Sequence, residues 1–183
     1  MNDEAPHLAL SAGTAVHCVH RLRDGSHVLV RGIRKDDVEI ERRFIQALSA
    51  QSRRFRFFGQ IGSPSDDFLR CLVDLDFVHD IAFVALVHID NMTREVGVAR
   101  YAVSEDGKSC ECAVAVDDAW HGRGLGTLLI GHLIEMARGQ GIGEMIAVVA
   151  AANRDMADLA ESLGFAGAGD PDDPSQKIYR LCL

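Results

Sequence analysis

A glycine-rich loop at residues 121–127, His-Gly-Arg-Gly-Leu-Gly-Thr, constrains this chain more than any other feature. The apolar run 112–116 precedes it, and apolar residues at helical spacing follow it from Leu125 to Ala137. Glycines at alternate positions let the backbone turn sharply and point successive N–H groups into one concavity, where the first turn of the helix adds positive potential. The order strand, glycine loop, helix therefore favours a phosphate-binding loop over a flexible connection.

Two common phosphate-binding motifs do not fit this loop. The dinucleotide motif needs Gly-x-Gly-x-x-Gly and an acidic residue about 20 positions on, at the end of the next strand. Here the glycines are Gly122, Gly124 and Gly126, and the acidic candidate, Glu144, stands at the start of the next apolar run. A nucleotide P-loop would require Gly-Lys-Ser/Thr, which does not follow the loop.

The loop resembles the acyl-CoA signature of the GNAT acetyltransferases, Gln/Arg-x-x-Gly-x-Gly/Ala, with His121 where the family usually has Gln or Arg. The resemblance covers about residues 28–182. The stretches 55–59, 96–101 and 152–156 are similar to the acetyltransferase domain of bacterial Pat-type protein lysine acetyltransferases. The resemblance implies an N-acetyltransferase that uses acetyl-CoA as co-substrate and no metal. It also implies an amine acceptor. Pat-type enzymes modify lysines of metabolic enzymes such as acyl-CoA synthetases, which favours a protein lysine.

Composition limits the other possibilities. With 183 residues, of which 48% are hydrophobic, we expect an N-terminal arm at 1–24 and a single domain at 25–183. A formal charge of −8 argues against nucleic-acid binding, which needs a basic surface. Five cysteines without a C-x-x-C pair indicate a reducing compartment. The acidic start and the lack of a long apolar run predict a cytoplasmic protein that does not cross a membrane. We expect a monomer or a homodimer, between which the sequence does not decide.

The order of the predicted elements indicates an α/β fold of mixed α+β type. A strand and helices are followed by three strands in an antiparallel meander, and then by helix, strand, helix and strand. This order is typical of a GNAT-like central mixed sheet of about six to seven strands flanked by about four helices. Predicted strands span 27–33, 81–87, 95–101, 109–116, 145–150 and 177–181, and predicted helices span 36–48, 51–58, 64–73, 124–138 and 154–163.

Local signals add four smaller expectations. Asp36 and Glu39 have the spacing of a capping box, and Ser63 before a proline is typical of a helix start. The arginines and phenylalanines of 51–58 predict a short helix that covers the core and leaves its arginines in solvent. Cations combined with aromatic residues also occur at nucleic-acid-binding surfaces. The run 17–20, His-Cys-Val-His, could bind a metal, but the sequence has no second pair of ligands at a suitable spacing. We therefore expect a surface segment.

Acetyl transfer to an amine needs a base, because a lysine amine is almost fully protonated at neutral pH. Glu111 is the one acidic side chain inside the strand that leads to the glycine loop, so rigid backbone holds it near the expected thioester. A GNAT glutamate on this strand often serves as base, which makes Glu111 the candidate; the alternative is a solvated strand acid. Cys110 and Cys112 alternate to the opposite face and read as buried strand residues rather than nucleophiles.

The resemblance also implies the residues that bind the cofactor. The backbone of Val114, Ala115 and Val116 would pair with the pantetheine arm, and Asn153 would contact the same arm or serve as a helix cap. In many GNAT enzymes a tyrosine protonates the departing thiolate, and Ala160 stands at that position here. The general acid would then be water or Tyr179, or the thiolate would leave without one. The diphosphate would be held by Gly122, Arg123, Gly124, Leu125, Gly126 and Thr127.

Two further functions stay open on the sequence alone. The missing tyrosine is compatible with a noncatalytic acyl-CoA-binding regulatory module. A small-amine acetyltransferase is compatible with the same fold, because acceptors vary widely on one scaffold.

Overall fold

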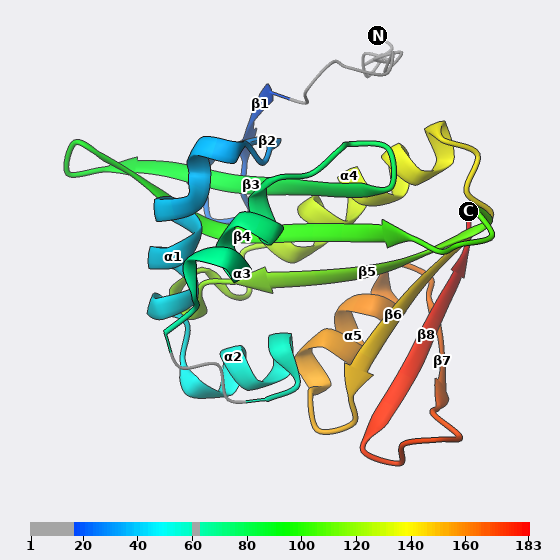
Figure 1. Cartoon of the computed structure of the whole chain (residues 1–183). Coiled ribbons are helices and arrows are strands. Elements are labelled where there is room, and N and C mark those ends of the chain that lie inside the picture. Colours follow the sequence, from blue (N-terminus) through cyan, green and yellow to red (C-terminus); the bar gives the residue numbers. More distant parts are fainter. Residues whose placement is uncertain (1–16, 60–62) are drawn as a thin grey trace, which may run out of the picture.

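The computed structural model describes residues 17–59 and 63–183. Within these residues eight strands form one mixed sheet in the order β1-β2-β3-β4-β5-β6-β8-β7, in which only β5 and β6 run parallel (Figure 1). The strands are β1 His17–Arg21, β2 His27–Gly32, β3 Asp80–Ile89, β4 Met92–Val103, β5 Ser109–Val116, β6 Glu144–Ala150, β7 Ala166–Gly169 and β8 Gln176–Cys182. The helices are α1 Val38–Ala47, α2 Ala50–Phe57, α3 Asp66–Val73, α4 Leu125–Gly139 and α5 Arg154–Ser162. The predicted mixed fold is confirmed, with slightly more strands than expected.

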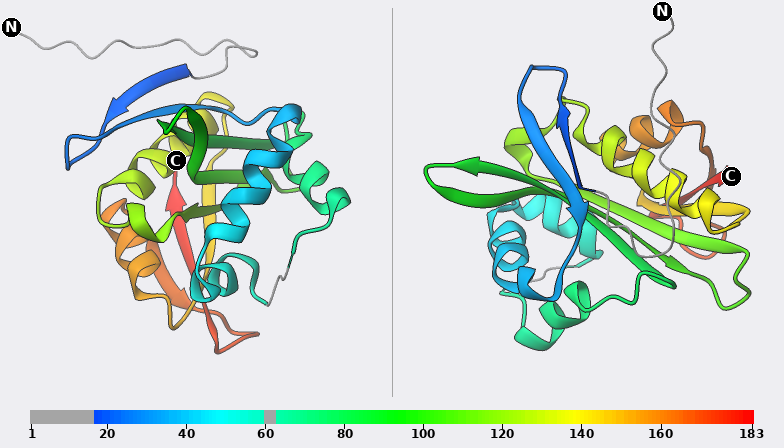
Figure 2. Two further views of the ribbon diagram at one scale, coloured as in Figure 1. Left: turned by 90° about the vertical axis from the view of Figure 1, so that its left-hand side faces the viewer. Right: turned by 90° about the horizontal axis from the view of Figure 1, so that it is seen from above.

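Helices cover both faces of the sheet and create two cores (Figure 2). On one face α4 buries Leu125, Leu129 and Leu133 against the central strands. On the other face α1 and α3 bury Phe44 and Leu69 against alternate residues of β3 and β4. β3 is covered on both sides, so residues 81–87 are all buried and form a continuous apolar run in the sequence. β6 is buried only at alternate residues, Met145, Ala147 and Val149.

The predicted meander of β3, β4 and β5 is confirmed as antiparallel. Asp90 and Asn91 both have positive φ in the tight turn between β3 and β4. A bulge then shifts the register, because Ala85 pairs with Gly97 whereas Leu86 pairs with Glu95. The bulge directs Glu95 to the face covered by α1, where it is buried.

The sheet splits between β5 and β6. The two strands pair only at Ser109–Glu144, Cys110–Met145 and Glu111–Ile146, and beyond that point they diverge (Figure 1). The carboxyl halves of both strands therefore lack each other as hydrogen-bonding partners, which leaves a wedge in the middle of the molecule.

The two edge strands, β1 and β7, were not predicted as separate strands from the sequence. β1 lies within the segment predicted as an arm and pairs with β2; residues 1–16 of that arm lie outside the described residues. β7 has the sequence Ala-Gly-Ala-Gly, which carries no strand pattern. Gly167 is required there because the ring of Tyr179, on the paired strand, would lie 2.5 Å from an added Cβ.

Two predicted helix starts were wrong. A 3₁₀ turn at Lys35–Asp37 precedes α1, and Asp37 rather than Asp36 accepts the hydrogen bond from the Arg34 N–H, at 2.8 Å. Asp37 is also held by a buried ion pair with Arg31, which fixes its position. For α3 the cap is Ser65, which accepts from the Phe68 N–H at 3.2 Å, so Pro64 precedes the helix. No helix in the described part of the chain is long and apolar enough to cross a membrane.

Candidate active site

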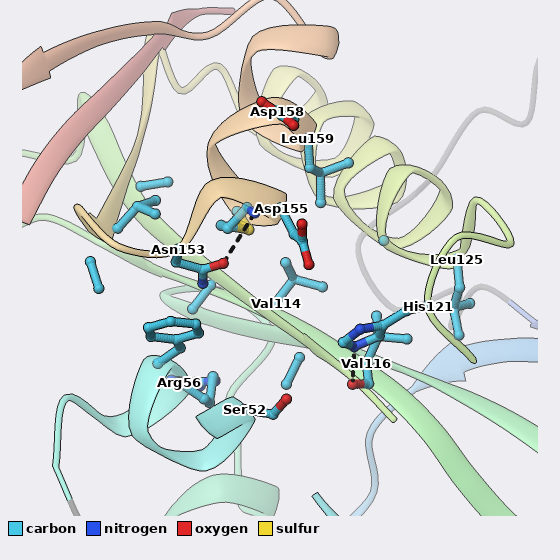
Figure 3. A pocket seen from close by; sticks show the side chains of 18 of the residues that line it. Ser52, Arg56, Val114, Val116, His121, Leu125, Asn153, Asp155, Asp158 and Leu159 are labelled. Carbon is cyan, nitrogen blue, oxygen red and sulfur yellow. Dashed lines mark hydrogen bonds between the residues drawn. The ribbon is translucent and has the colours of Figure 1, made fainter. Parts of the chain in front are cut away.

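A cleft of about 1100 Å³ opens where β5 and β6 diverge. One wall is α2, the opposite wall is α5, and the floor comprises the separated halves of the two strands. In Figure 3, Ser52 and Arg56 reach the cleft from α2, while Asn153, Asp155 and Leu159 face them from the α5 side. Among the residues predicted for the site, those that line the cleft are Glu111, Val114, Ala115, Val116, Gly122, Gly124, Leu125, Gly126, Thr127 and Asn153.

The glycine loop has the geometry expected of an anion cradle. Gly122 and Gly124 have φ of +73° and +85°, which side chains rarely tolerate. α4 begins at Leu125, so the N–H groups of its first turn have no intrahelical acceptor and border the cleft. A Cβ at Gly126 would lie 3.0 Å from the Leu159 side chain, so glycine permits the close approach of α4 and α5. These features fit a diphosphate.

The backbone of β5 presents alternate residues to the cleft. The Asp117 N–H donates to the Val96 carbonyl on β4, so the ladder directs the polar groups of Ala115 to β4 as well. Val114 and Val116 then direct theirs toward the gap beside β6. The Nε2 of His121 lies 3.0 Å from the Val116 carbonyl, drawn as a dashed line in Figure 3. The edge that faces the cleft therefore fits an extended chain with amide groups.

Asn153 has a structural role and also lines the cleft. Its Oδ1 accepts a hydrogen bond from the Met156 N–H at 3.2 Å, which caps α5. The same side chain borders the cleft in Figure 3. Its amide nitrogen carries two further donors, so the capping role does not prevent contact with a ligand.

Glu111 lies at the apex of the wedge, since it is the last residue of β5 that pairs with β6. Its side chain lines the cleft, whereas Cys110 and Cys112 point into the opposite core. Burial raises the pKa of both thiols to about 12, so neither is a thiolate at neutral pH. The expectation of buried strand cysteines agrees with this placement.

Arg56 is a cleft residue that the sequence did not reveal. It was expected to be solvated, but burial, together with the charge of Arg100, lowers its pKa to about 10. Its charge is balanced by Glu41 and Glu111. Arg54 on the same helix is exposed, as predicted. The acidic partners of Arg56 stand on α1 and β5, so no local pattern in the sequence predicts its burial.

Behind Arg56 lies a buried charge cluster formed by Glu41, Glu95 and Arg100. The Arg100 Nη2 lies 3.6 Å from Glu41 Oε1, whereas neither carboxylate oxygen of Glu95 has a hydrogen-bond donor in the described part of the chain. Burial first, and then the charge of Glu41, raises the pKa of Glu95. Glu41 is the carboxyl that lies beside the Arg100 guanidinium, so burial favours the protonated form at Glu95 more than at Glu41.

Asp118 lies in the turn between β5 and the glycine loop, and its hydrogen bonds connect this turn to the start of α2. Its carboxylate accepts from the Ser49 N–H at 2.9 Å and from the hydroxyls of Ser49 and Ser52, each at 2.8 Å. Partial burial opposes ionisation, but these hydrogen bonds outweigh it and hold the pKa of Asp118 below its usual value. The cap of α2 thus comes partly from a residue 69 positions away, which a local capping rule does not detect.

Arg123 is the predicted site residue whose side chain turns away from the cleft. Its Nη1 donates to Asp24 Oδ2 at 2.8 Å and its Nη2 to the Ala119 carbonyl at 2.8 Å. Its guanidinium also lies over the ring of Trp120, 4.5 Å from the centroid. Arg123 therefore fastens the loop to the β1–β2 turn and is not among the residues that line the cleft.

The chain has two tyrosines, and neither lines the cleft. Tyr101 and Tyr179 are 2% and 1% exposed, and the Tyr179 hydroxyl donates to Glu161 at 3.5 Å. Ala160 is buried on α5. In the described part of the chain no group of three or more His, Cys, Asp or Glu side chains has metal-site geometry, and His20 of β1 contacts His132 of α4 instead, with 3.1 Å between their Nε2 atoms.

Comparison with known proteins points to one family. The model of the acetyltransferase (GNAT) family matches residues 49–165. A Pseudomonas aeruginosa protein named Acetyltransferase PA5475 is 48% identical over 175 residues, which cover 96% of this chain and 94% of that protein.

Solved structures agree with this assignment. The GNAT domain of S. lividans PAT superimposes with a TM-score of 0.82 at 26% identity, covering 91% of this chain and 97% of the other. The ribosomal L7/L12 α-N-protein acetyltransferase RimL, solved with coenzyme A, shares the fold with a TM-score of 0.71 at 14% identity over 93% of this chain and 98% of the other. The chain therefore belongs to the GNAT family of acetyltransferases, as an N-acetyltransferase that uses acetyl-CoA and resembles the domain of Pat.

Proposed function

We propose that this protein transfers the acetyl group of acetyl-CoA to the ε-amine of a protein lysine, with Glu111 as general base. The observation that carries the proposal is the position of Glu111 on the cleft side of β5, at the point where β5 and β6 separate. Rigid strand backbone holds the carboxylate where an amine entering between α2 and the wedge would meet it, directly or through one water.

The cleft supports direct attack by the amine. The buried thiols of Cys110 and Cys112 are protonated and face the opposite core, so an acyl-cysteine intermediate has no candidate nucleophile on this strand. Glu111 accepts one proton of the acceptor ammonium, and the neutral amine attacks the thioester carbonyl to form the new C–N bond. The C–S bond then breaks, and the second proton of the amine nitrogen passes to the departing CoA thiolate or to water. A thiol with a pKa near that of cysteine is a good leaving group, so the reaction does not require a tyrosine as acid.

The choice of a lysine rests on two supports. The GNAT domain of S. lividans PAT matches most of this chain at 26% identity. The cleft that Glu111 lines is also lined by Phe55 and Phe57 of α2 and by Phe58 at its C-cap, which are apolar surfaces suited to the aliphatic stem of a lysine. A small primary amine is the alternative acceptor, and the experiment below distinguishes the two.

The test of the base compares Glu111→Gln with Glu105→Gln, an exposed acid in the turn between β4 and β5. We expect Glu111→Gln to lower kcat by about 100-fold or more, the usual contribution of a general base, while the Kd for acetyl-CoA measured by calorimetry stays within about twofold. Glu105→Gln should change neither quantity. Unchanged turnover of Glu111→Gln across the pH range would remove this residue from the mechanism.

The test of the acceptor uses two panels with acetyl-CoA, one of small amines and one of folded lysine-bearing proteins. CoA release measures turnover, and mass spectrometry locates the acetyl-lysine. Acetylation of a protein lysine, absent with Glu111→Gln, is the expected result. Rapid turnover of a polyamine, amino acid or aminoglycoside, with no protein acetylated, would overturn the lysine assignment while leaving the family and the cofactor intact.

A further inference from the structure

The turn between β1 and β2 is fastened to the glycine loop. The backbone N–H of Arg23 donates to the Arg123 carbonyl at 3.2 Å, and the Arg123 guanidinium donates to Asp24 at 2.8 Å. Asp24 is itself held in the turn, since it accepts from the N–H and the hydroxyl of Ser26. The turn therefore has a fixed position relative to the loop, although almost 100 residues separate them in the chain.

This attachment brings the side chain of Arg23 to the glycine loop. An added Cβ at Gly124 would lie 3.2 Å from its Nε and 3.5 Å from its Cγ and Cδ. Arg23 lines the same cleft as Gly122, Gly124 and the first turn of α4. Within residues 17–59 and 63–183 its guanidinium has no hydrogen-bond or ion-pair partner, whereas that of Arg123 is engaged by Asp24 and Ala119.

Other side chains near the loop that carry N–H groups have partners elsewhere. His121 lies with its ring nitrogen against the Val116 carbonyl, and Arg123 faces out of the cleft. The second arginine that lines the cleft, Arg56 of α2, is partly buried, and its charge is balanced by Glu41 and Glu111. Arg23 is thus the guanidinium that reaches the glycine loop from the cleft side in the part of the chain that the structure describes.

We propose that Arg23 binds a phosphate group of coenzyme A, so that the β1–β2 turn completes the cofactor site from outside the glycine loop. The proposal rests on the use of acetyl-CoA by this chain and goes beyond the backbone cradle. A guanidinium suits this role because its parallel N–H groups match two phosphate oxygens. Coenzyme A offers this chemistry twice, in its diphosphate and in its 3′-phosphate.

The experiment measures Kd by calorimetry for Arg23→Gln, with Arg138→Gln as the matched control. Arg138 is an exposed arginine in the last turn of α4, at the end remote from the loop, and its replacement changes the net charge equally. We expect Arg23→Gln to weaken coenzyme A binding by about 10- to 100-fold, the usual contribution of a hydrogen bond to a charged group. Arg138→Gln should bind within about twofold of the wild type.

Dephospho-coenzyme A, which lacks the 3′-phosphate, identifies the phosphate. If Arg23 binds the 3′-phosphate, Arg23→Gln loses affinity for coenzyme A but not for the dephospho form. If it binds the diphosphate, the affinity for both falls equally. Arg23→Lys keeps a point charge without the planar fork, so its Kd should lie between those of the wild type and Arg23→Gln.

Thermal unfolding without ligand shows whether each variant is folded. An Arg23→Gln protein with wild-type Tm and wild-type Kd for both ligands would overturn the proposal. A wild-type protein that binds no coenzyme A would instead overturn the cofactor site on which the proposal rests, so the two failures are distinguishable.

Discussion

Gly124 has two properties that a side chain would disturb, a left-handed backbone conformation and close contact with Arg23. Its φ of +85° lies in the left-handed region, and Arg23 packs where a side chain would project. Gly131, in the middle of α4, has nothing within 4 Å of an added Cβ. The two glycines therefore form a matched pair, one required by the site and one free to vary.

Substitution of Gly124 by aspartate tests the cradle. The new carboxylate would stand at the loop and repel the diphosphate, so we expect the Kd for acetyl-CoA to rise at least about 100-fold, or about 3 kcal/mol. The same change at Gly131 adds an equal charge in the middle of α4, away from the loop, and should leave the Kd nearly unaltered. Calorimetry measures both, and equal affinities for the two variants would contradict the phosphate assignment.

At the scale of the residue, the sequence predicted those features that depend on residues close together in the chain. The glycine loop, the Asn153 cap and the position of Glu111 all follow from spacing within one or two elements. Arg23, Arg56 and Asp118 were not predicted, because Arg23 lies against the distant Gly124 and the partners of Arg56 and Asp118 are distant in the chain.

The same limit explains the errors in the elements. β7 pairs with β8, and its Gly167 leaves room for the Tyr179 ring, so its own side chains do not reveal it. Asp37 rather than Asp36 accepts from the Arg34 N–H, and the distant Arg31 holds it there. Tertiary contacts decide such cases, and a single sequence does not display them.

At the scale of the element, β5 is divided into two edges. Ala113 and Ala115 direct their N–H groups to β4, whereas Val114 and Val116 direct theirs into the wedge beside β6. The backbone of this half of β5 is therefore paired with β4 on one side and has no paired strand on the other.

Hydrogen exchange at single residues should reveal this division. Without ligand we expect the amides of Val114 and Val116 to exchange at least about 10-fold faster than those of Ala113 and Ala115, because they have no partner strand. Coenzyme A should slow the two valine amides and leave the alanine amides almost unchanged. NMR measures all four in one sample, and four equally protected amides without ligand would show that the wedge is closed in solution.

At the scale of the whole molecule, the buried cluster couples stability to pH. Glu95 is 4% exposed, and its pKa is raised by burial and by Glu41. Between the unfolded-state pKa, about 4.3, and the raised folded-state value, the native state binds the extra proton. The free energy of unfolding therefore falls as pH rises through this window.

Glu95→Gln should remove this dependence, because the amide is a neutral replacement for a protonated carboxyl. As pH rises above 5 we expect the free energy of unfolding of the wild type to fall relative to that of Glu95→Gln, with a slope of at most about 1.4 kcal/mol per pH unit, the contribution of one proton. Urea denaturation at several pH values gives the two slopes. Glu105→Gln, at an exposed turn, should keep the wild-type slope, and the same slope in Glu95→Gln would show that Glu95 is ionised in the fold.

The stacking of Arg123 on Trp120 has a practical consequence. Trp120 is the only tryptophan in the sequence, and it lines the cleft beside the glycine loop. Indole emission under selective excitation therefore originates from a single place, and it is sensitive to whatever enters the cleft or moves the guanidinium above the ring. The protein thus carries its own fluorescent reporter, with which cofactor titrations can be followed optically without any label.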